Sequence, residues 1–178
     1  MVDGEIDYIL IDEKTLQKRV KELAQKITAD YPDEESELVV IGILKGSVYF
    51  FADLTRQIER PLKVEFIAVS SYGNSSCSSG EVRLVKDTDE TIRGKDVIIV
   101  EDIIDTGATL KYLAALLKAR SPRSVKVCAL LDKPARRQVA VSADYTGFEV
   151  PDKFIVGYGL DYAQKYRNLP YVAVLKNG

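Results

Sequence analysis

Residues 97–110 read VIIVEDIIDTGATL, and this stretch indicates the fold more clearly than any other part of the chain. Its first four residues are β-branched and apolar, as in a strand that is buried on both faces of a parallel sheet. The carboxylates Glu101 and Asp102 come next, and the polar turn DTGAT follows two apolar residues later. Leu110 then opens an apolar pattern of helical period. This order predicts an anion site at the carboxyl end of a strand.

The polar turn has the donors that a phosphate group needs. Backbone N–H groups at a helix N-terminus lack intrahelical partners, and the helix dipole attracts an anion. Gly107 allows the backbone to approach a ligand closely, and Thr106 and Thr109 add hydroxyl donors. The neighbouring acids would repel phosphate unless they bind hydroxyl groups or a metal ion. A sugar phosphate with free ribose hydroxyls and bound magnesium fits both the acidic pair and the turn. The alternative interpretation of this stretch is a strand followed by a solvated acidic turn and a helix cap, with no ligand.

Composition limits the class of protein. The chain has 178 residues, of which 46% are hydrophobic, so residues 1–178 are expected to form one globular domain. The net charge of −2 gives no basic field for nucleic acid. The N-terminal MVDGEIDYIL does not resemble a signal peptide, and no apolar run is long enough to span a bilayer. We therefore expect a cytoplasmic protein with no membrane partner.

The amino-acid composition limits which side chains can act as a nucleophile or a general base. The chain has no His, which excludes a Ser-His-Asp triad, a Cys-His pair and a His-ligated zinc site. Any general base must be Asp, Glu, Lys, Tyr or Cys. Cys77 and Cys128 lack metal-ligand spacing; Cys128 lies in the apolar VKVCALL and is expected to be a reduced core residue. Cys77 lies in a Ser-rich loop, where it is either an inert surface thiol or an oxidisable one.

Strands and helices alternate along the chain. Residues 13–27 have an amphipathic helical pattern that Asp12 can cap, and strands are predicted at 38–44, 62–69, 124–131 and 171–175. Short extended pieces are expected at 148–150 and 153–156, and a short hairpin arm at 81–85. Residues 70–80 form a long loop rich in Ser and Gly. The pattern predicts an α/β fold with an open, mainly parallel twisted sheet flanked by helices, and its ligands beyond the carboxyl ends of the strands.

Five segments together resemble a known family. They occur in family order as LVVIGILKGS, the SSYG loop, GKDVIIVEDIIDTGATL, LLDKPARR and VPDKFIVGYGLDYAQKYRNLP. The chain resembles the type I phosphoribosyltransferases, and among them the bacterial-type hypoxanthine and hypoxanthine-guanine enzymes. The resemblance covers nearly the whole chain and implies a small hood and a mobile lid loop in addition to the sheet. The implied reaction is purine salvage: phosphoribose passes from phosphoribosyl pyrophosphate to hypoxanthine and/or guanine, which gives IMP or GMP and pyrophosphate.

The resemblance also implies roles for the central stretch. Glu101 and Asp102 are expected to face the ribose hydroxyls, directly or through magnesium, and the turn to wrap the 5′-phosphate. Asp105 corresponds to the general base. That turn comprises Asp105, Thr106, Gly107, Ala108 and Thr109. Several relatives carry a longer residue at Ala108, where a backbone amide would serve equally.

Further residues are matched outside the central stretch. Lys133 corresponds to a donor to the 6-oxo group of the purine, although spacing alone fits a surface lysine equally well. Phe154 corresponds to an aromatic that stacks on the purine, and without the family it would be assigned to the core. Asp161 corresponds to a ligand of a second magnesium ion. Other matched positions are the pyrophosphate contacts Lys45, Gly46 and Arg167, the base contact Ile155, and the loop residues Ser71 and Tyr72.

Two competing interpretations stay open at this level. The first keeps the fold and changes the base to xanthine or a pyrimidine; Lys133 and the FIVGYGLDY segment favour a 6-oxopurine. The second is a regulator that senses the sugar diphosphate and binds RNA or DNA; the acid at Asp105 and the lack of basic excess weigh against it. Relatives of this family form dimers and tetramers, so the resemblance implies a homodimer or a homotetramer.

Overall fold

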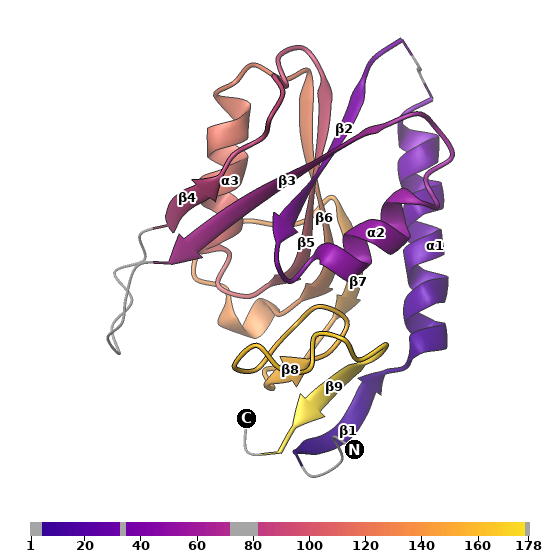
Figure 1. Ribbon diagram of the computed structural model, residues 1–178, viewed down its shortest axis with the longest axis vertical. Helices are drawn as coiled ribbons and strands as arrows, with labels where there is room; N and C mark the ends of the chain where they lie inside the picture. The colour runs from indigo at the N-terminus through magenta and orange to yellow at the C-terminus, as the bar shows by residue number, and fades with distance from the viewer. Residues whose placement is uncertain (1–4, 33–34, 72–81, 177–178) are drawn as a thin grey trace.

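The computed structural model describes residues 5–32, 35–71 and 82–176, and its centre is a six-stranded sheet (Figure 1). The strand order is β4-β3-β2-β5-β6-β7, and β4 alone runs antiparallel to its neighbour. The predicted open, mainly parallel sheet is therefore confirmed. Its strands are β2 (Leu38–Leu44), β3 (Lys63–Ser71), β4 (Val82–Lys86), β5 (Asp96–Ile104), β6 (Ser124–Asp132) and β7 (Tyr145–Glu149).

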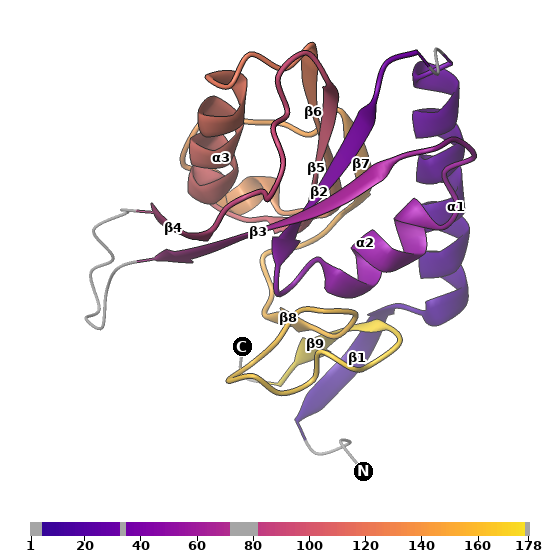
Figure 2. The ribbon, with the colours of Figure 1, turned by 45° about the horizontal axis from the view of Figure 1, so that its top comes forward.

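Helices cover both faces of this sheet (Figure 2). Helices α1 (Glu13–Asp30) and α2 (Val48–Thr55) lie on one face, and α3 (Ala108–Lys118) lies on the other. Successive side chains of β5 alternate between the two layers, because strand side chains point to opposite faces. Ile98 and Val100 pack with α1 and α2, whereas Val97 and Ile99 pack with α3. The uninterrupted apolar runs seen in the sequence follow from burial on both faces.

The start of α1 agrees with its predicted cap. The Asp12 side chain accepts a hydrogen bond of 2.7 Å from the Thr15 N–H. The hairpin arm expected near residues 81–85 is also confirmed, as β4 pairs antiparallel with the end of β3. No helix in the described ranges is long and apolar enough to cross a membrane.

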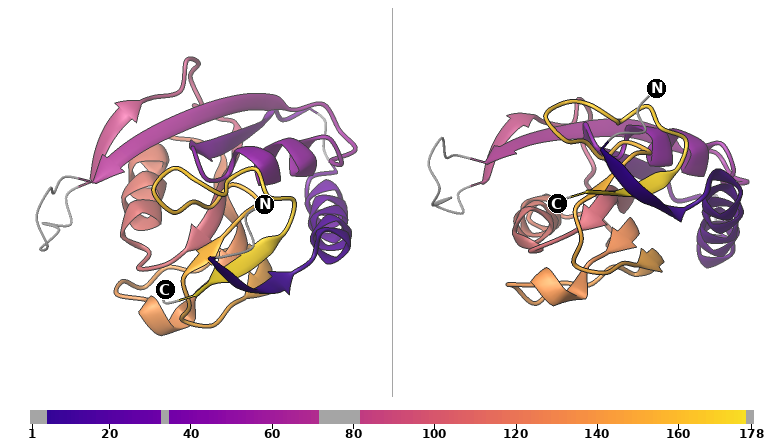
Figure 3. Two further views of the ribbon diagram at one scale, coloured as in Figure 1. Left: turned by 60° about the horizontal axis from the view of Figure 1, so that its bottom comes forward. Right: turned by 90° about the horizontal axis from the view of Figure 1, so that it is seen from below.

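A small second sheet forms a hood over one end of the main sheet (Figure 3). It contains β1 (Ile6–Ile11), β9 (Val172–Leu175) and β8 (Ile155–Val156), in the order β1-β9-β8. The last predicted strand therefore exists, but it pairs with the N-terminal strand rather than extending the main sheet. A hydrogen bond of 2.6 Å from the Tyr158 hydroxyl to Asp53 joins the segment after β8 to α2. The hood lies at the carboxyl ends of β5 and β6, where the sequence predicts the ligands (Figures 1 and 2).

Candidate active site

Two cavities open at the carboxyl end of β5, and residues of the hood line the larger one. The larger has a volume of about 500 Å³, and the smaller of about 90 Å³. Asp105 and Ile103 line both of them. The larger is lined by Ile103, Asp105, Lys133, Arg136, Asp152, Lys153, Phe154, Ile155, Leu160 and Asp161. The smaller is lined by Glu101, Ile103, Ile104, Asp105, Thr106, Gly107, Thr109 and Leu110.

The smaller cavity is formed by the predicted strand–turn–helix segment. Strand β5 ends at Ile104, and α3 begins at Ala108 with Gly107 as its N-cap. Gly107 has a φ of 85°, and a Cβ at this position would lie 2.5 Å from a methyl carbon of Val141. Both the left-handed backbone and the close packing require glycine here. The cavity volume and its backbone donors suit a single phosphate group.

Glu101 of the acidic pair lines this cavity, and the carboxylates of both acids are perturbed by burial. Burial raises the pKa of Glu101 well above its ordinary value, and the Asp102 charge raises it further. Burial also raises the pKa of Asp102, although the Ile103 N–H donates a hydrogen bond of 2.9 Å to its carboxylate. The Glu101 Oε2 atom is buried and has no hydrogen-bond partner among the residues that the structure describes. Such a pair favours a ligand that brings hydroxyl donors or positive charge.

Glycines bring three segments together beside Asp102. A Cβ on Gly46, in the turn after β2, would lie 1.7 Å from the Asp102 Oδ2 atom. A Cβ on Gly159, in the hood, would lie 1.9 Å from the Gly46 carbonyl oxygen. The backbone of the β2 turn therefore lies between the acidic pair and the hood. Lys45 is exposed at the start of this turn, and the peptide bond that precedes it is cis.

Arg167 is part of the hood structure rather than a solvated surface charge. Its Nη1 atom donates a hydrogen bond of 2.6 Å to the Gly159 carbonyl, and its Nη2 atom lies 2.7 Å from Asp161 Oδ1. Asp161 Oδ2 accepts a second hydrogen bond of 2.8 Å from the Gln164 N–H. Both carboxylate oxygens of Asp161 are thus engaged within the hood. The described residues contain no group of three or more His, Cys, Asp or Glu side chains that could hold a metal ion by themselves.

The larger cavity contains the residues matched to the base. Lys133 is only 6% exposed, so the surface interpretation of this lysine is wrong. Its ammonium donates a hydrogen bond of 2.8 Å to the Lys153 carbonyl. Phe154 is 40% exposed, which excludes the alternative of a core residue, and its ring meets Tyr162 edge-on at 5.4 Å between centroids. A flat apolar ring and a buried cation therefore line one cavity together with Ile155.

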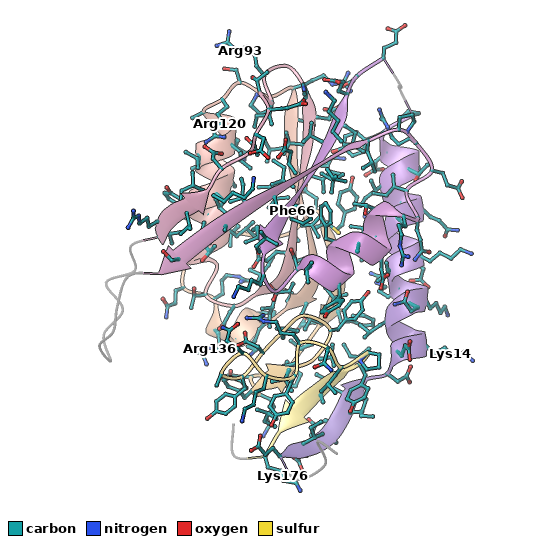
Figure 4. The ribbon with its side chains drawn as sticks, viewed as in Figure 1. Lys14, Phe66, Arg93, Arg120, Arg136 and Lys176 are labelled. Carbon is teal, nitrogen blue, oxygen red and sulfur yellow. The ribbon has the colours of Figure 1, made fainter. Side chains whose placement is uncertain are left out.

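Asp105 lies between the two cavities and has a cationic neighbour that the sequence did not suggest. Its side chain is 42% exposed, and its Oδ1 atom lies 3.1 Å from the Nε atom of Arg136. Arg136 ends the short helix η1 (Pro134–Arg136) and lies beside the hood (Figure 4). Arg136 lies in LLDKPARR and Lys153 in VPDKF, and the family resemblance implies no role for either charge. Charged residues in a loop give no periodic signal that would have distinguished them.

Two predicted positions remain, Ser71 and Tyr72. Ser71 is the last residue of β3. Tyr72 and the greater part of the predicted lid lie outside the described residues. The site thus brings together residues matched from four of the five sequence segments.

Comparisons with known proteins agree with this geometry. A family model described as a phosphoribosyl transferase domain matches residues 10–163. The chain is 51% identical over 176 residues to a hypoxanthine-guanine phosphoribosyltransferase of Bacillus subtilis, covering 99% of this chain and 97% of that one. It is 52% identical over 173 residues to a bifunctional protein TilS/HprT of Listeria innocua, covering 97% of this chain but 26% of that protein. A crystal structure of a hypoxanthine-guanine phosphoribosyltransferase from Bacillus anthracis aligns with a TM-score of 0.90 at 52% identity. The alignment covers 97% of this chain and 100% of that one.

Proposed function

The chain belongs to the phosphoribosyltransferase family, and we propose that it transfers phosphoribose from phosphoribosyl pyrophosphate to hypoxanthine and/or guanine. The products are IMP or GMP and pyrophosphate, so the enzyme works in purine salvage. We place the two substrates in these cavities because Asp105 lines both of them. A phosphate site and a site for a flat ring must share one wall if the ribose between them is to be joined to the base.

The sugar phosphate occupies the smaller cavity and the space beside the acidic pair in this proposal. The turn of residues 105–109 supplies backbone and hydroxyl donors to the 5′-phosphate. Glu101 and Asp102 accept hydrogen bonds from the ribose hydroxyls. Lys45, Gly46 and Arg167 face the pyrophosphate, and the contact between Gly46 and Asp102 keeps these regions adjacent.

The purine occupies the larger cavity. Phe154 stacks on the ring, Ile155 contacts its edge, and the Lys133 ammonium donates to the 6-oxo group. Only one of the three ammonium donors of Lys133 is used by the Lys153 carbonyl, so donors remain for a ligand. The amino group of adenine offers no suitable acceptor at this position, and this favours a 6-oxopurine over adenine.

The reaction breaks the bond between the anomeric carbon and pyrophosphate and forms a bond from that carbon to nitrogen 9 of the purine. Positive charge develops on the ribose ring, and the Glu101 and Asp102 carboxylates stabilise it. Asp105 accepts the proton that leaves nitrogen 7 of the base. The leaving pyrophosphate takes the bonding electrons, and the cationic groups Lys45 and Arg167 stabilise its added charge.

A divalent metal ion fits this site, and magnesium is the ion we propose. The buried Glu101 Oε2 atom has no hydrogen-bond partner within the described ranges, and Asp102 lies beside it. Magnesium keeps several waters and binds substrate phosphates, so it does not need a cage made of protein groups alone. When bound, it neutralises charge on the pyrophosphate. Asp161 is proposed as the ligand of a second ion, which requires that its pairing with Arg167 be exchanged for the metal.

Four further expectations stay predictions. Ser71 and Tyr72 reach over the ligands as part of a lid, which would exclude water from the reacting ribose. A homodimer or homotetramer is implied by the family and would be measured by light scattering during size-exclusion chromatography. A cytoplasmic location and a single domain over residues 1–178 complete the proposal.

An activity assay tests the proposed function against its competitors. The purified protein is incubated with magnesium, phosphoribosyl pyrophosphate and one of hypoxanthine, guanine, xanthine, adenine or uracil, and nucleotide formation is followed. IMP and GMP are the expected products, with little turnover of adenine or uracil. Binding of phosphoribosyl pyrophosphate without turnover of any base would instead support the regulator.

A further inference from the structure

Arg137 lies behind the phosphate-binding turn and lines neither of the two cavities described. Its side chain is 17% exposed, and its Nη1 atom donates a hydrogen bond of 2.7 Å to the Asp105 carbonyl. Its Nη2 atom pairs with the carboxylate of Asp132, the last residue of β6. One guanidinium thus joins the end of β6 to the backbone of the turn after β5.

The residues that follow Arg137 continue this contact. The Gln138 N–H donates a hydrogen bond of 3.0 Å to the Thr106 carbonyl. Val139 and Val141 pack against Gly107, where an added Cβ would lie 3.1 Å and 2.5 Å from their methyl carbons. Residues 137–141 therefore support the turn along its back, with polar contacts to two successive carbonyls.

These contacts determine where the N–H groups of the turn point. A trans peptide unit is planar, and its C=O and N–H groups point in opposite directions. Because Arg137 holds the Asp105 carbonyl, the Thr106 N–H of the same unit points away from Arg137. The Gly107 N–H points away from Gln138 for the same reason. Within the described ranges, neither N–H donates to another group of the chain.

We propose that Arg137, anchored by Asp132, is a positioning residue that fixes these two peptide units so that their N–H groups face the 5′-phosphate. If a unit turned over, its carbonyl oxygen would face the phosphate and repel it. The planar fork of arginine presents Nη1 to one partner and Nη2 to the other in a fixed geometry, whereas lysine would offer both partners one ammonium nitrogen. The inference rests on the proposed function, because the phosphate is that of the substrate and product nucleotide.

The test compares two ligands that differ only in the phosphate. Wild-type protein and Arg137→Met are titrated with IMP and with inosine by calorimetry. The affinity of the variant for IMP should fall by about 10- to 100-fold, because charge-assisted hydrogen bonds to the phosphate are lost. Its affinity for inosine should stay within about 2-fold of wild type, since inosine lacks the phosphate that the Thr106 and Gly107 N–H groups would bind. Equal losses for both ligands, or no loss for IMP, would overturn the positioning role.

A matched control separates positioning from general destabilisation. Arg120 also binds a carboxylate through two nitrogens, with distances of 2.7 Å and 2.6 Å to Asp87, at the far end of α3 from the site (Figure 4). Arg120→Met should lower the melting temperature without changing the ratio of IMP to inosine affinity.

Arg137→Lys keeps the charge beside Asp132 and serves if Arg137→Met does not fold. This variant should also lower the affinity for IMP more than the affinity for inosine, and an equal loss for both ligands would overturn the proposal. A folded wild-type protein that neither binds IMP nor converts hypoxanthine would refute the proposed function instead.

Discussion

Replacement of Lys133 by Met should change which base the enzyme accepts. The Lys133 side chain is buried at the wall of the larger cavity, and one hydrogen bond of 2.8 Å holds its ammonium to the Lys153 carbonyl. Met has a similar length and no donor, so the shape of the wall is largely kept. Hypoxanthine then loses its partner for the 6-oxo group, while adenine is freed from a cation facing its amino group.

The magnitude follows from the kind of bond that is lost. A hydrogen bond to a charged group contributes about 1.5–3 kcal/mol, which corresponds to roughly 10- to 150-fold in kcat/KM for hypoxanthine. The Lys153 carbonyl also loses its donor in this variant. That loss lowers stability for every substrate alike, so it cancels in the ratio of hypoxanthine to adenine.

The assay is therefore a ratio of two kcat/KM values measured in the same preparation. Lys153→Met is the matched control, because its side chain is an exposed lysine in the wall of the same cavity and its carbonyl is retained. The ratio should fall in Lys133→Met and stay near the wild-type value in Lys153→Met. A ratio that is unchanged in Lys133→Met would remove Lys133 from recognition of the base.

Three other predictions concern the site and the core. Gly46→Ala places a methyl group against the Asp102 carboxylate, so the KM for phosphoribosyl pyrophosphate should rise by about 10-fold or more with little change in melting temperature. Burial alone would raise the pKa of Asp96, but hydrogen bonds, led by that from Arg123, lower it below its ordinary value. The stabilisation by Asp96 is thus present above about pH 4 and lost as the pH falls through the lowered pKa, and Asp96→Asn should flatten this acid dependence in urea unfolding. Cys128 is buried, and burial raises the pKa of its thiol, so alkylation of Cys128 should require unfolding of the protein. The label is detected in the tryptic peptide that contains Cys128, and rapid labelling of the native protein would contradict this prediction.

The sequence predicted the part of the fold that depends on local pattern. Residues 97–110 showed a buried strand, an acidic pair and a turn before a helix, and β5 and α3 have this arrangement. Burial on both faces explains why these strands were easy to recognise. The matched residues Lys133 and Phe154 do line one cavity, and exposure decided between their alternative interpretations.

The parts that were missed depend on contacts between distant residues. Strand β1 pairs with β9, near the other end of the chain, and no local pattern specifies that pairing. Arg136 and Arg137 are adjacent in the sequence, yet the first lies beside the Asp105 carboxylate and the second behind the same turn. Only the path of the chain through η1 distinguishes their positions.

The central claim is that Asp105 takes the proton from the base while the surrounding turn binds the sugar phosphate. Asp105→Asn keeps the shape of the side chain and removes its basicity, so it is the most direct test. In single-turnover reactions with saturating hypoxanthine, magnesium and phosphoribosyl pyrophosphate, the rate should fall by roughly 10²–10⁴-fold. The affinity for phosphoribosyl pyrophosphate should change far less. A single-turnover rate close to that of the wild-type protein would contradict the assignment of Asp105 as the base.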